Sequence, residues 1–169
     1  GLVLPDVTNT QALPNIARTW DIDASGTNFT FHLGDVLYHN GNKLVAEDIV
    51  WNWKRTIEEV GDRGRGKAHL ALVTDYTAAD DKTFNVSTEF ITPIFMSERV
   101  VSIPYISDPS SISTIDVAPV YTGPYRFRKL VPGDKAEYEL FPDHHDKQVL
   151  RGKPTTFISV PIELDLTRL

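Results

Sequence analysis

The chain has 169 residues, of which 41% are apolar and 24% charged, values that are normal for a soluble globular protein with a core of ordinary size. Its net charge of −6 argues against a nucleic-acid-binding protein, because such a protein presents a basic face to the phosphate backbone. The absence of cysteine excludes a disulfide framework and any metal site built on thiolates.

Two strands joined by a tight turn are predicted near the start of the chain, over Ala17–Ile22 and Asn28–Leu33. In the second strand apolar and polar residues alternate, which is the period of a half-buried strand and places His32 on the exposed face. Ala24-Ser25-Gly26-Thr27 forms the turn. A short extended piece over residues 36–38 then ends at Asn40-Gly41, a strong turn dipeptide.

An amphipathic helix is predicted over residues 46–60. Glu47 and Asp48 lie in its first turn, where the helix dipole favours negative charge, and Gly61 suits the position after its end. Residues 63–67 then read as a basic loop. The face expected to be buried consists of residues at helical spacing, namely Ala46, Ile49, Val50, Trp53, Ile57 and Val60.

The central part of the chain predicts a hairpin, a short helix and a loop. The hairpin pairs residues 73–78 with residues 83–90. Thr92 and Pro93 suit the start of a helix that runs to residue 101. Residues 102–107 are predicted to be extended. Residues 108–120 are rich in Ser, Thr, Asp and Pro and are predicted to be a loop, which makes them the best internal boundary.

Three further strands are predicted in the last third, over residues 125–130, 136–141 and 155–164. Pro132-Gly133-Asp134 supplies the turn between the first two. Together with the earlier elements, this pattern indicates a mixed α/β protein with hairpins and one main helix.

Two motifs resemble ligand loops and are interpreted as ordinary turns. Residues 61–67 match Gly-x-x-x-x-Gly-Lys, but Ala68 follows where a phosphate-binding loop needs Ser or Thr, and a helix precedes the loop instead of a strand. Asp21, Asp23 and Ser25 mimic the start of a calcium loop. Its twelfth position should be a bidentate Glu, but His32 stands there, so a hairpin turn is expected.

No other pattern supports metal binding or catalysis. Asp143-His144-His145-Asp146 offers metal-ligand side chains, but neighbouring side chains diverge, so a functional metal site is not expected. We find no cysteine, no Gly-x-Ser-x-Gly elbow and no His-Glu-x-x-His pair. An enzyme is therefore not expected, and no cofactor is predicted.

In its ordered set of motifs, the chain resembles the extracellular solute-binding proteins of family 5, the peptide and nickel receptors of ABC importers. Each motif alone is weak, but together they follow the order of the family and cover nearly the whole chain. They are Leu13-Pro14-Asn15-Ile16-Ala17-Arg18-Thr19-Trp20, Thr30-Phe31-His32-Leu33, Tyr38-His39-Asn40-Gly41 with Leu44-Val45-Ala46-Glu47-Asp48, Thr122-Gly123-Pro124-Tyr125, Val131-Pro132-Gly133-Asp134 and Gly152-Lys153-Pro154.

The resemblance implies a type II periplasmic-binding-protein-like partial lobe with mixed sheets. Residues 1–117 would be the smaller subdomain of the first lobe, and residues 118–169 would supply strands of its main sheet. Because family members are far longer, the chain is expected to be a fragment from the first half of such a receptor, without the second lobe.

The chain departs from the family pattern at three places. Gly34-Asp35 stands where Arg is usual, and His144-His145 stands near the family's Tyr-Trp. Val45 replaces the Thr that would cap the helix, which should weaken that cap by roughly 1 kcal/mol unless another group substitutes.

The resemblance also implies where a solute would bind. The expected cleft surface includes Arg65, His69, Tyr105, Tyr121 and Tyr125, with Arg65 pairing an anionic group and Tyr105 stacking on the solute or forming a hydrogen bond with it. The solute would be an oligopeptide or metal chelate, and the partner an ABC permease in the membrane. The protein would be periplasmic or a cell-surface lipoprotein. The alternative is a stand-alone α/β interaction or carbohydrate-binding module.

Overall fold

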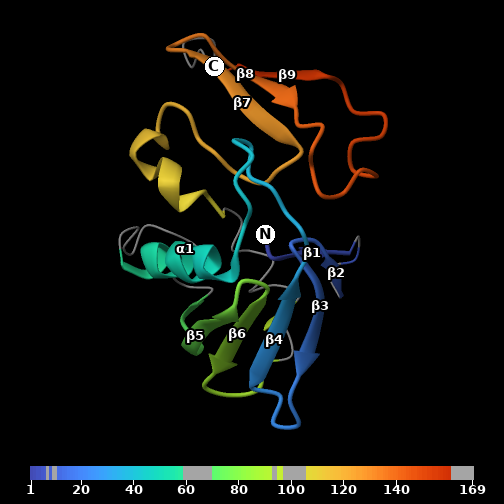
Figure 1. Cartoon of the computed structure of the whole chain (residues 1–169), viewed down its shortest axis with the longest axis vertical. Helices are drawn as coiled ribbons and strands as arrows, with labels where there is room; N and C mark the ends of the chain where they lie inside the picture. Colours follow the sequence, from blue (N-terminus) through green and yellow to red (C-terminus); the bar gives the residue numbers. More distant parts are fainter. Residues whose placement is uncertain (7, 9–10, 59–69, 93–94, 97–105, 161–169) are drawn as a thin grey trace, which may run out of the picture.

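The computed structural model describes residues 1–6, 8, 11–58, 70–92, 95–96 and 106–160. Within these residues the chain forms three sheets, all of antiparallel pairs, and one α-helix, α1 (Ala46–Glu58). The four-stranded and the three-stranded sheet lie at opposite ends of the long axis of the molecule (Figure 1).

The largest sheet has the strand order β3-β4-β6-β5, and its strands are β3 (Ala17–Ile22), β4 (Asn28–Leu33), β5 (Val73–Asp80) and β6 (Thr83–Thr88). Alternation in β4 and β6 sends one set of side chains to the core, and α1 covers that set (Figure 1). Trp53 of α1 meets Phe84 of β6 edge to face, with ring centroids 4.9 Å apart. These contacts form the centre of the core.

The opposite face of this sheet is polar, as the alternation predicts. His32 lies there with a side chain that is 45% exposed, and its Nε2 is 2.8 Å from Asp21 Oδ2. At the β3–β4 turn the carboxylate of Asp23 accepts hydrogen bonds from Ser25 and Asn28, which lower the pKa of Asp23 far below its usual range. The segment that mimicked a calcium loop is therefore a hairpin turn, as expected.

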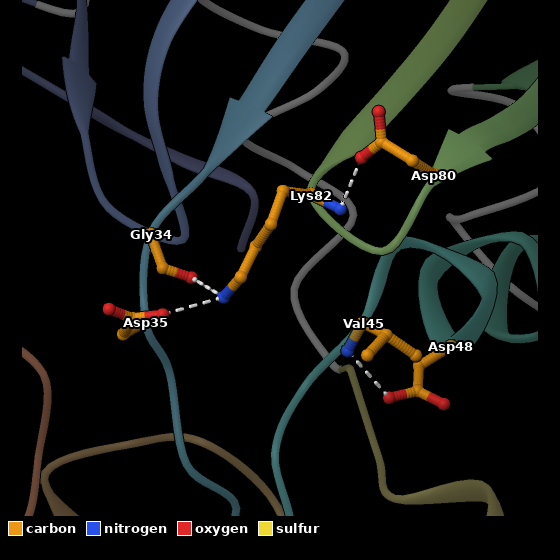
Figure 2. A network of polar contacts seen from close by, with 6 residues as sticks. All are labelled: Gly34, Asp35, Val45, Asp48, Asp80 and Lys82. Atoms are coloured by element: carbon orange, nitrogen blue, oxygen red, sulfur yellow. Dashed lines mark hydrogen bonds and ion pairs between the residues drawn. The ribbon is translucent and has the colours of Figure 1, made fainter.

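A network around Lys82 connects the β5–β6 turn to the end of β4 (Figure 2). Lys82 Nζ donates to the carbonyl of Gly34 at 3.0 Å and pairs with Asp35 Oδ1 at 2.9 Å, and its backbone nitrogen donates to Asp80 Oδ1. The next contact reaches the helix, because the backbone nitrogen of Ala46 donates to the carbonyl of Asp81. The turn thereby fixes where α1 starts relative to the sheet.

The small sheet at the start of the chain was not predicted. It pairs β1 (Val3–Pro5) with β2 (Ala12–Pro14), and three-residue strands are too short to show a period in the sequence. Leu2 and Val3 are buried in the same core as α1. The N-terminal strands therefore share one hydrophobic core with the large sheet and α1, and we call these elements together the N-terminal body.

The last sheet has the order β7-β8-β9 and consists of β7 (Tyr125–Val131), β8 (Lys135–Leu140) and β9 (Thr156–Ser159). All four residues of β9 are exposed, including Phe157 and Ile158 at about half of their maximum. Phe141 is the only residue of the described part from 125 to 160 with a fully buried apolar side chain. This sheet thus contributes little to the core of the chain.

The prediction for residues 108–120 was partly wrong, because Pro109–Thr114 form a 3-10 helix. Asp108 caps this helix, with its carboxylate accepting from the backbone nitrogen of Ser110 at 2.9 Å. Proline at the first helical position is tolerated, and Asp is a preferred cap. Ser- and Thr-rich composition indicated a loop but carries no periodic signal for so short a helix.

Other boundaries shift by a few residues. β5 extends to Asp80 instead of residue 78, and β6 ends at Thr88 instead of residue 90, because the chain bends at residues 89–90. β9 ends at Ser159, and the rest of the strand predicted to residue 164 falls mostly outside the described residues. So do the end of the predicted helix over 46–60, the loop at 63–67 and most of residues 92–107.

None of the described helices combines the length and the apolar character that a bilayer crossing requires.

Candidate functional site

A pocket of about 420 Å³ lies between the N-terminal part of the chain and the segments that flank β7 and β8. Leu4 and Asn15 contribute from the N-terminal strands, and Ile106 from the segment before the 3-10 helix. The remaining wall comes from the 38–40 turn, the turn at 121–125 and the loop at 144–149. This is the volume of a small-molecule site, with apolar walls and a few polar groups.

His39 joins the two turns that form one side of the pocket. Its Nε2 donates to the carbonyl of Gly123 at 2.9 Å, and its Nδ1 accepts from the backbone nitrogen of Tyr121 at 3.4 Å. The backbone nitrogen of His39 donates in turn to the carbonyl of Tyr121 at 2.9 Å. Burial lowers the pKa of His39, so the ring is neutral near pH 7.

His144 and His145 form the opposite side. Their rings stack with centroids 4.1 Å apart. His145 Nε2 is 3.0 Å from Asn15 Oδ1, and because Asn15 Nδ2 donates to the carbonyl of Gly1, the oxygen faces the imidazole and Nε2 is the donor. His145 Nδ1 is then a buried acceptor that finds no hydrogen-bond partner among the described residues, and burial lowers the pKa of His145 to about 4.

Two residues predicted to line the solute cleft, Tyr121 and Tyr125, both line this pocket. Tyr125 Oη donates to the carbonyl of Pro154 at 2.8 Å, and its ring lies 6.1 Å from that of Phe157. The structure therefore places these two tyrosines together. Arg65, His69 and Tyr105 lie outside the described residues.

Sequence reasoning missed the histidines and Asn15 as parts of one site. His39 lies in the 38–40 turn, but its hydrogen-bond partners are more than 80 residues away in the sequence. The only sequence signal was the adjacent His144-His145 pair, which departs from the aromatic pair of the resembled family. That pair was considered for metal binding.

Backbone groups occupy several of the imidazole nitrogens of the pocket. No carboxylate is among the described side chains that line it, and the nitrogens of His39 are both used by backbone groups. His144 Nδ1 is within hydrogen-bond distance of the backbone of Asp146. Within the described ranges no three His, Cys, Asp or Glu side chains converge as metal ligands.

The sequence of residues 11–161 matches the family model "Bacterial extracellular solute-binding proteins, family 5 Middle". Among curated proteins, a dipeptide-binding protein from Lactococcus lactis subsp. cremoris is 26% identical over 184 residues, which cover 93% of this chain and 33% of that protein. A di/tripeptide-binding protein 4 from Pseudomonas aeruginosa is 22% identical and is covered to 31%. The chain thus spans about a third of the length of the curated relatives it matches.

Solved structures show the same fold at low identity. NikZ from Campylobacter jejuni, in complex with Ni(L-His), superposes with a TM-score of 0.80 at 21% identity over 96% of this chain and 33% of its own. AgaA from A. tumefaciens R10, in complex with agropinic acid, gives a TM-score of 0.80 at 20% identity over 95% of this chain and 33% of its own. The fold is therefore that of periplasmic binding proteins of type II, as predicted.

Proposed function

We propose, from the premise that this chain belongs to the bacterial extracellular solute-binding proteins of family 5, that it is part of a receptor that delivers a solute to an ABC importer. The receptor would be non-catalytic. The observation that carries the proposal is the family match over residues 11–161, joined to a fold shared with solute-bound receptors along nearly the whole chain.

We also propose that the chain is one segment of a larger two-lobed protein. Residues 1–117 would form the smaller subdomain of the first lobe, and residues 118–169 would belong to the main sheet of that lobe. The described structure supports this division, because the first group shares one core around α1 whereas β7, β8 and β9 form a separate sheet.

The exposed apolar side chains of the last sheet support the same proposal. Leu130, Phe157, Ile158 and Val160 are 45% to 60% exposed. Phe157 and Ile158 are consecutive residues of β9, so they lie on opposite faces of the sheet, and both faces carry exposed apolar side chains. The rest of the receptor, which makes up two thirds of the relatives, would cover part of this exposed apolar surface.

For the solute, we propose an oligopeptide or a metal chelate, two of the classes bound by the relatives and structural neighbours. Tyr121 and Tyr125 would line its site from the pocket described above, and Arg65, His69 and Tyr105 would approach it from elsewhere in the first lobe. Closure of two lobes on the solute would then present the receptor to its permease. The working location would be outside the cytoplasmic membrane, as a periplasmic protein or a cell-surface lipoprotein.

The test is calorimetric titration of the full-length protein that contains this chain. The probes are a set of di- and tripeptides, the nickel–histidine chelate and agropinic acid. Saturable binding of one class, with no turnover of the ligand, is the expected result. Chemical conversion of a bound probe would overturn the non-catalytic assignment, and binding of agropinic acid alone, or of no probe at all, would overturn the proposed solute classes.

A further inference from the structure

At the pocket, histidine side chains join the N-terminal part of the molecule, which contains the large sheet, to the part that contains β7, β8 and β9. On one side His39 holds the turn at 121–125, and on the other His145 holds the N-terminal strands through Asn15. A third hydrogen bond, from Arg18 Nη2 to the carbonyl of His145 at 3.3 Å, lies next to the second contact. We call this set of contacts, made by His39, His144 and His145, the histidine junction.

The hydrogen bonds of His39 fix its protonation state. Nδ1 faces the backbone N–H of Tyr121, so it must offer a lone pair, and Nε2 faces the carbonyl of Gly123, so it must carry the hydrogen. A second proton on Nδ1 would set two N–H groups against each other. Proton uptake at His39 therefore breaks its contact with Tyr121.

Proton uptake at His145 is unfavourable for a different reason. Its Nε2 already donates to Asn15, so a proton would go to Nδ1, which is buried and has no hydrogen-bond partner within the described part of the chain. The added charge would also lie against the stacked ring of His144, 4.1 Å away. A buried donor without a partner, next to a second imidazole, destabilises the closed junction.

The charged groups that surround these rings do not compensate the added charge. Arg18 and Lys147 face the His144–His145 pair, and Arg126 of β7 faces His39. Asp146 is the one opposing carboxylate among the groups that act on the pair, and burial outweighs it. All three imidazoles are therefore held neutral.

We propose that the histidine junction is an acid-sensitive latch between the N-terminal body and the β7–β9 sheet, which is closed when the three imidazoles are neutral and opens when they take up protons. This inference does not depend on the identity of the solute. Because the junction also forms the pocket wall, opening would change the shape of the pocket as the medium becomes acidic.

The expected size follows from proton linkage. The pKa of His145 is lowered from 6.5 to about 4 in the closed state. If opening exposes the ring fully to water, proton uptake at pH 5 shifts the equilibrium between the closed and open states toward the open state by about 30-fold. The sign is that of a lowered histidine pKa: the latch is strongest above about pH 6.5 and weakens as pH falls below it. His39 and His144 add in the same direction.

Hydrogen exchange of the full-length protein, followed by mass spectrometry at about pH 7 and about pH 5, tests the proposal. After correction for intrinsic exchange, protection of residues 121–125 and 143–147 should fall about tenfold or more between the two conditions. Protection of β4 and β6 should not. A uniform change across all these segments would overturn the proposal.

The double variant His39→Gln and His145→Gln removes the titrating groups at two of the three positions, and the extra loss of protection at low pH should largely disappear. His32→Gln is the matched control, because His32 lies on the exposed face of the large sheet and should leave the pattern unchanged. A loss of the same size in the double variant would refute the latch.

A second measurement avoids the variants, should they fail to fold. Histidine ring titration by NMR in the unaltered protein should show proton uptake by His39 and His145 together with loss of protection at the amide of Tyr121. Proton uptake by these histidines with a pKa near the ordinary value of 6.5, without loss of protection at the Tyr121 amide, would overturn the proposal.

Discussion

The carboxylate of Asp48 accepts a hydrogen bond from the backbone nitrogen of Val45 at 3.1 Å, immediately before α1. Asp48 is the third residue of the helix, so this contact is the backward half of a capping box. The forward half is missing because valine has no hydroxyl, and the nitrogen of Asp48 bonds to the carbonyl of Val45 instead. The Asp48 carboxylate thus partly offsets the expected loss of a cap, although the sequence indicated only a favourable interaction of its charge with the helix dipole.

Restoring the hydroxyl should stabilise the protein. In Val45→Thr the hydroxyl can accept from the first-turn nitrogens, and we expect the free energy of unfolding to rise by about 0.5–1 kcal/mol. Denaturant unfolding of the full-length protein measures this change. The matched control is Val50→Thr in the same helix, where a hydroxyl enters a partly buried apolar contact and the free energy should fall. Stabilisation by both variants, or by neither, would contradict the capping argument.

Asn52 should be among the most sensitive polar positions of the core. It is 5% exposed, its Nδ2 donates to the carbonyls of Asp48 and Ser107, and its Oδ1 accepts from both the backbone nitrogen and the hydroxyl of Ser107. Asn52→Ala leaves these buried groups unpaired, so we expect a loss of about 2–4 kcal/mol in unfolding free energy. Thermal and denaturant unfolding report the loss.

Ser107→Ala provides the scale for that measurement. It removes one hydroxyl from the same network and keeps the backbone bonds to Asn52, so its cost should be about 1 kcal/mol. Equal costs for the two variants would show that the hydroxyl alone, and not the amide side chain, holds this segment to α1.

The contrast between Trp53 and Asn52 shows what the sequence reveals about this fold. The period of apolar residues identified α1 and the buried position of Trp53, and alternation identified β4 to the residue. A periodic pattern records which face is buried, but it assigns a polar residue to the solvent side. Asn52 is buried because Ser107 satisfies it from 55 residues away, and no local pattern reports such a partner.

The pocket could not be predicted from the sequence for the same reason, because its residues are distant from one another along the chain. Tyr121 and Tyr125 were found through the resemblance to a family, not through their own chemistry. His39, Asn15 and His145 meet there only because two turns and a loop distant in sequence converge. Short strands such as β1 and β2, which bring Asn15 to the site, carry too few residues for a period.

Protonation of the Asp108 carboxylate should lower the free energy of unfolding at strongly acidic pH. Burial alone would raise the pKa of its carboxyl, but hydrogen bonds from Asn40, Asn42 and Ser110 outweigh burial and lower it. Because the folded pKa lies below the unfolded value of 3.8, the contribution is present above that pH and is lost as pH falls through the folded pKa.

Asp108→Asn tests this origin. An amide nitrogen would replace one oxygen that now accepts hydrogen bonds, so we expect a loss of about 1–3 kcal/mol near neutral pH. The difference in unfolding free energy between the two proteins should narrow below about pH 4, as the wild-type carboxyl takes up a proton. Asp134→Asn, at an exposed turn, is the control. A difference that stays constant with pH would rule out the carboxylate as its source.

Lys82 should contribute mainly through its bond to the Gly34 carbonyl and little through its ion pair. Asp35, the partner in that pair, is fully exposed, so the pair is screened by water and salt. We expect Lys82→Met to cost about 1 kcal/mol of unfolding free energy and Asp35→Asn almost nothing. Unfolding curves at low and high salt separate the two contributions. A larger cost for Asp35→Asn, abolished by salt, would reverse this assignment.

Tyr125 offers a test of whether the pocket meets the solute. Its hydroxyl is already used by the carbonyl of Pro154, so a solute would contact the ring. If the ring packs on the solute, Tyr125→Phe should bind within about threefold of the unaltered full-length protein, whereas Tyr125→Ala should weaken binding by about tenfold or more. Calorimetric titration with the solute identified for the receptor gives both values. Tyr138→Ala is the matched control, because that aromatic residue lies in the neighbouring strand β8 and is not part of the pocket wall. Equal affinity for Tyr125→Ala and the unaltered protein would place the solute elsewhere and leave the fold assignment intact.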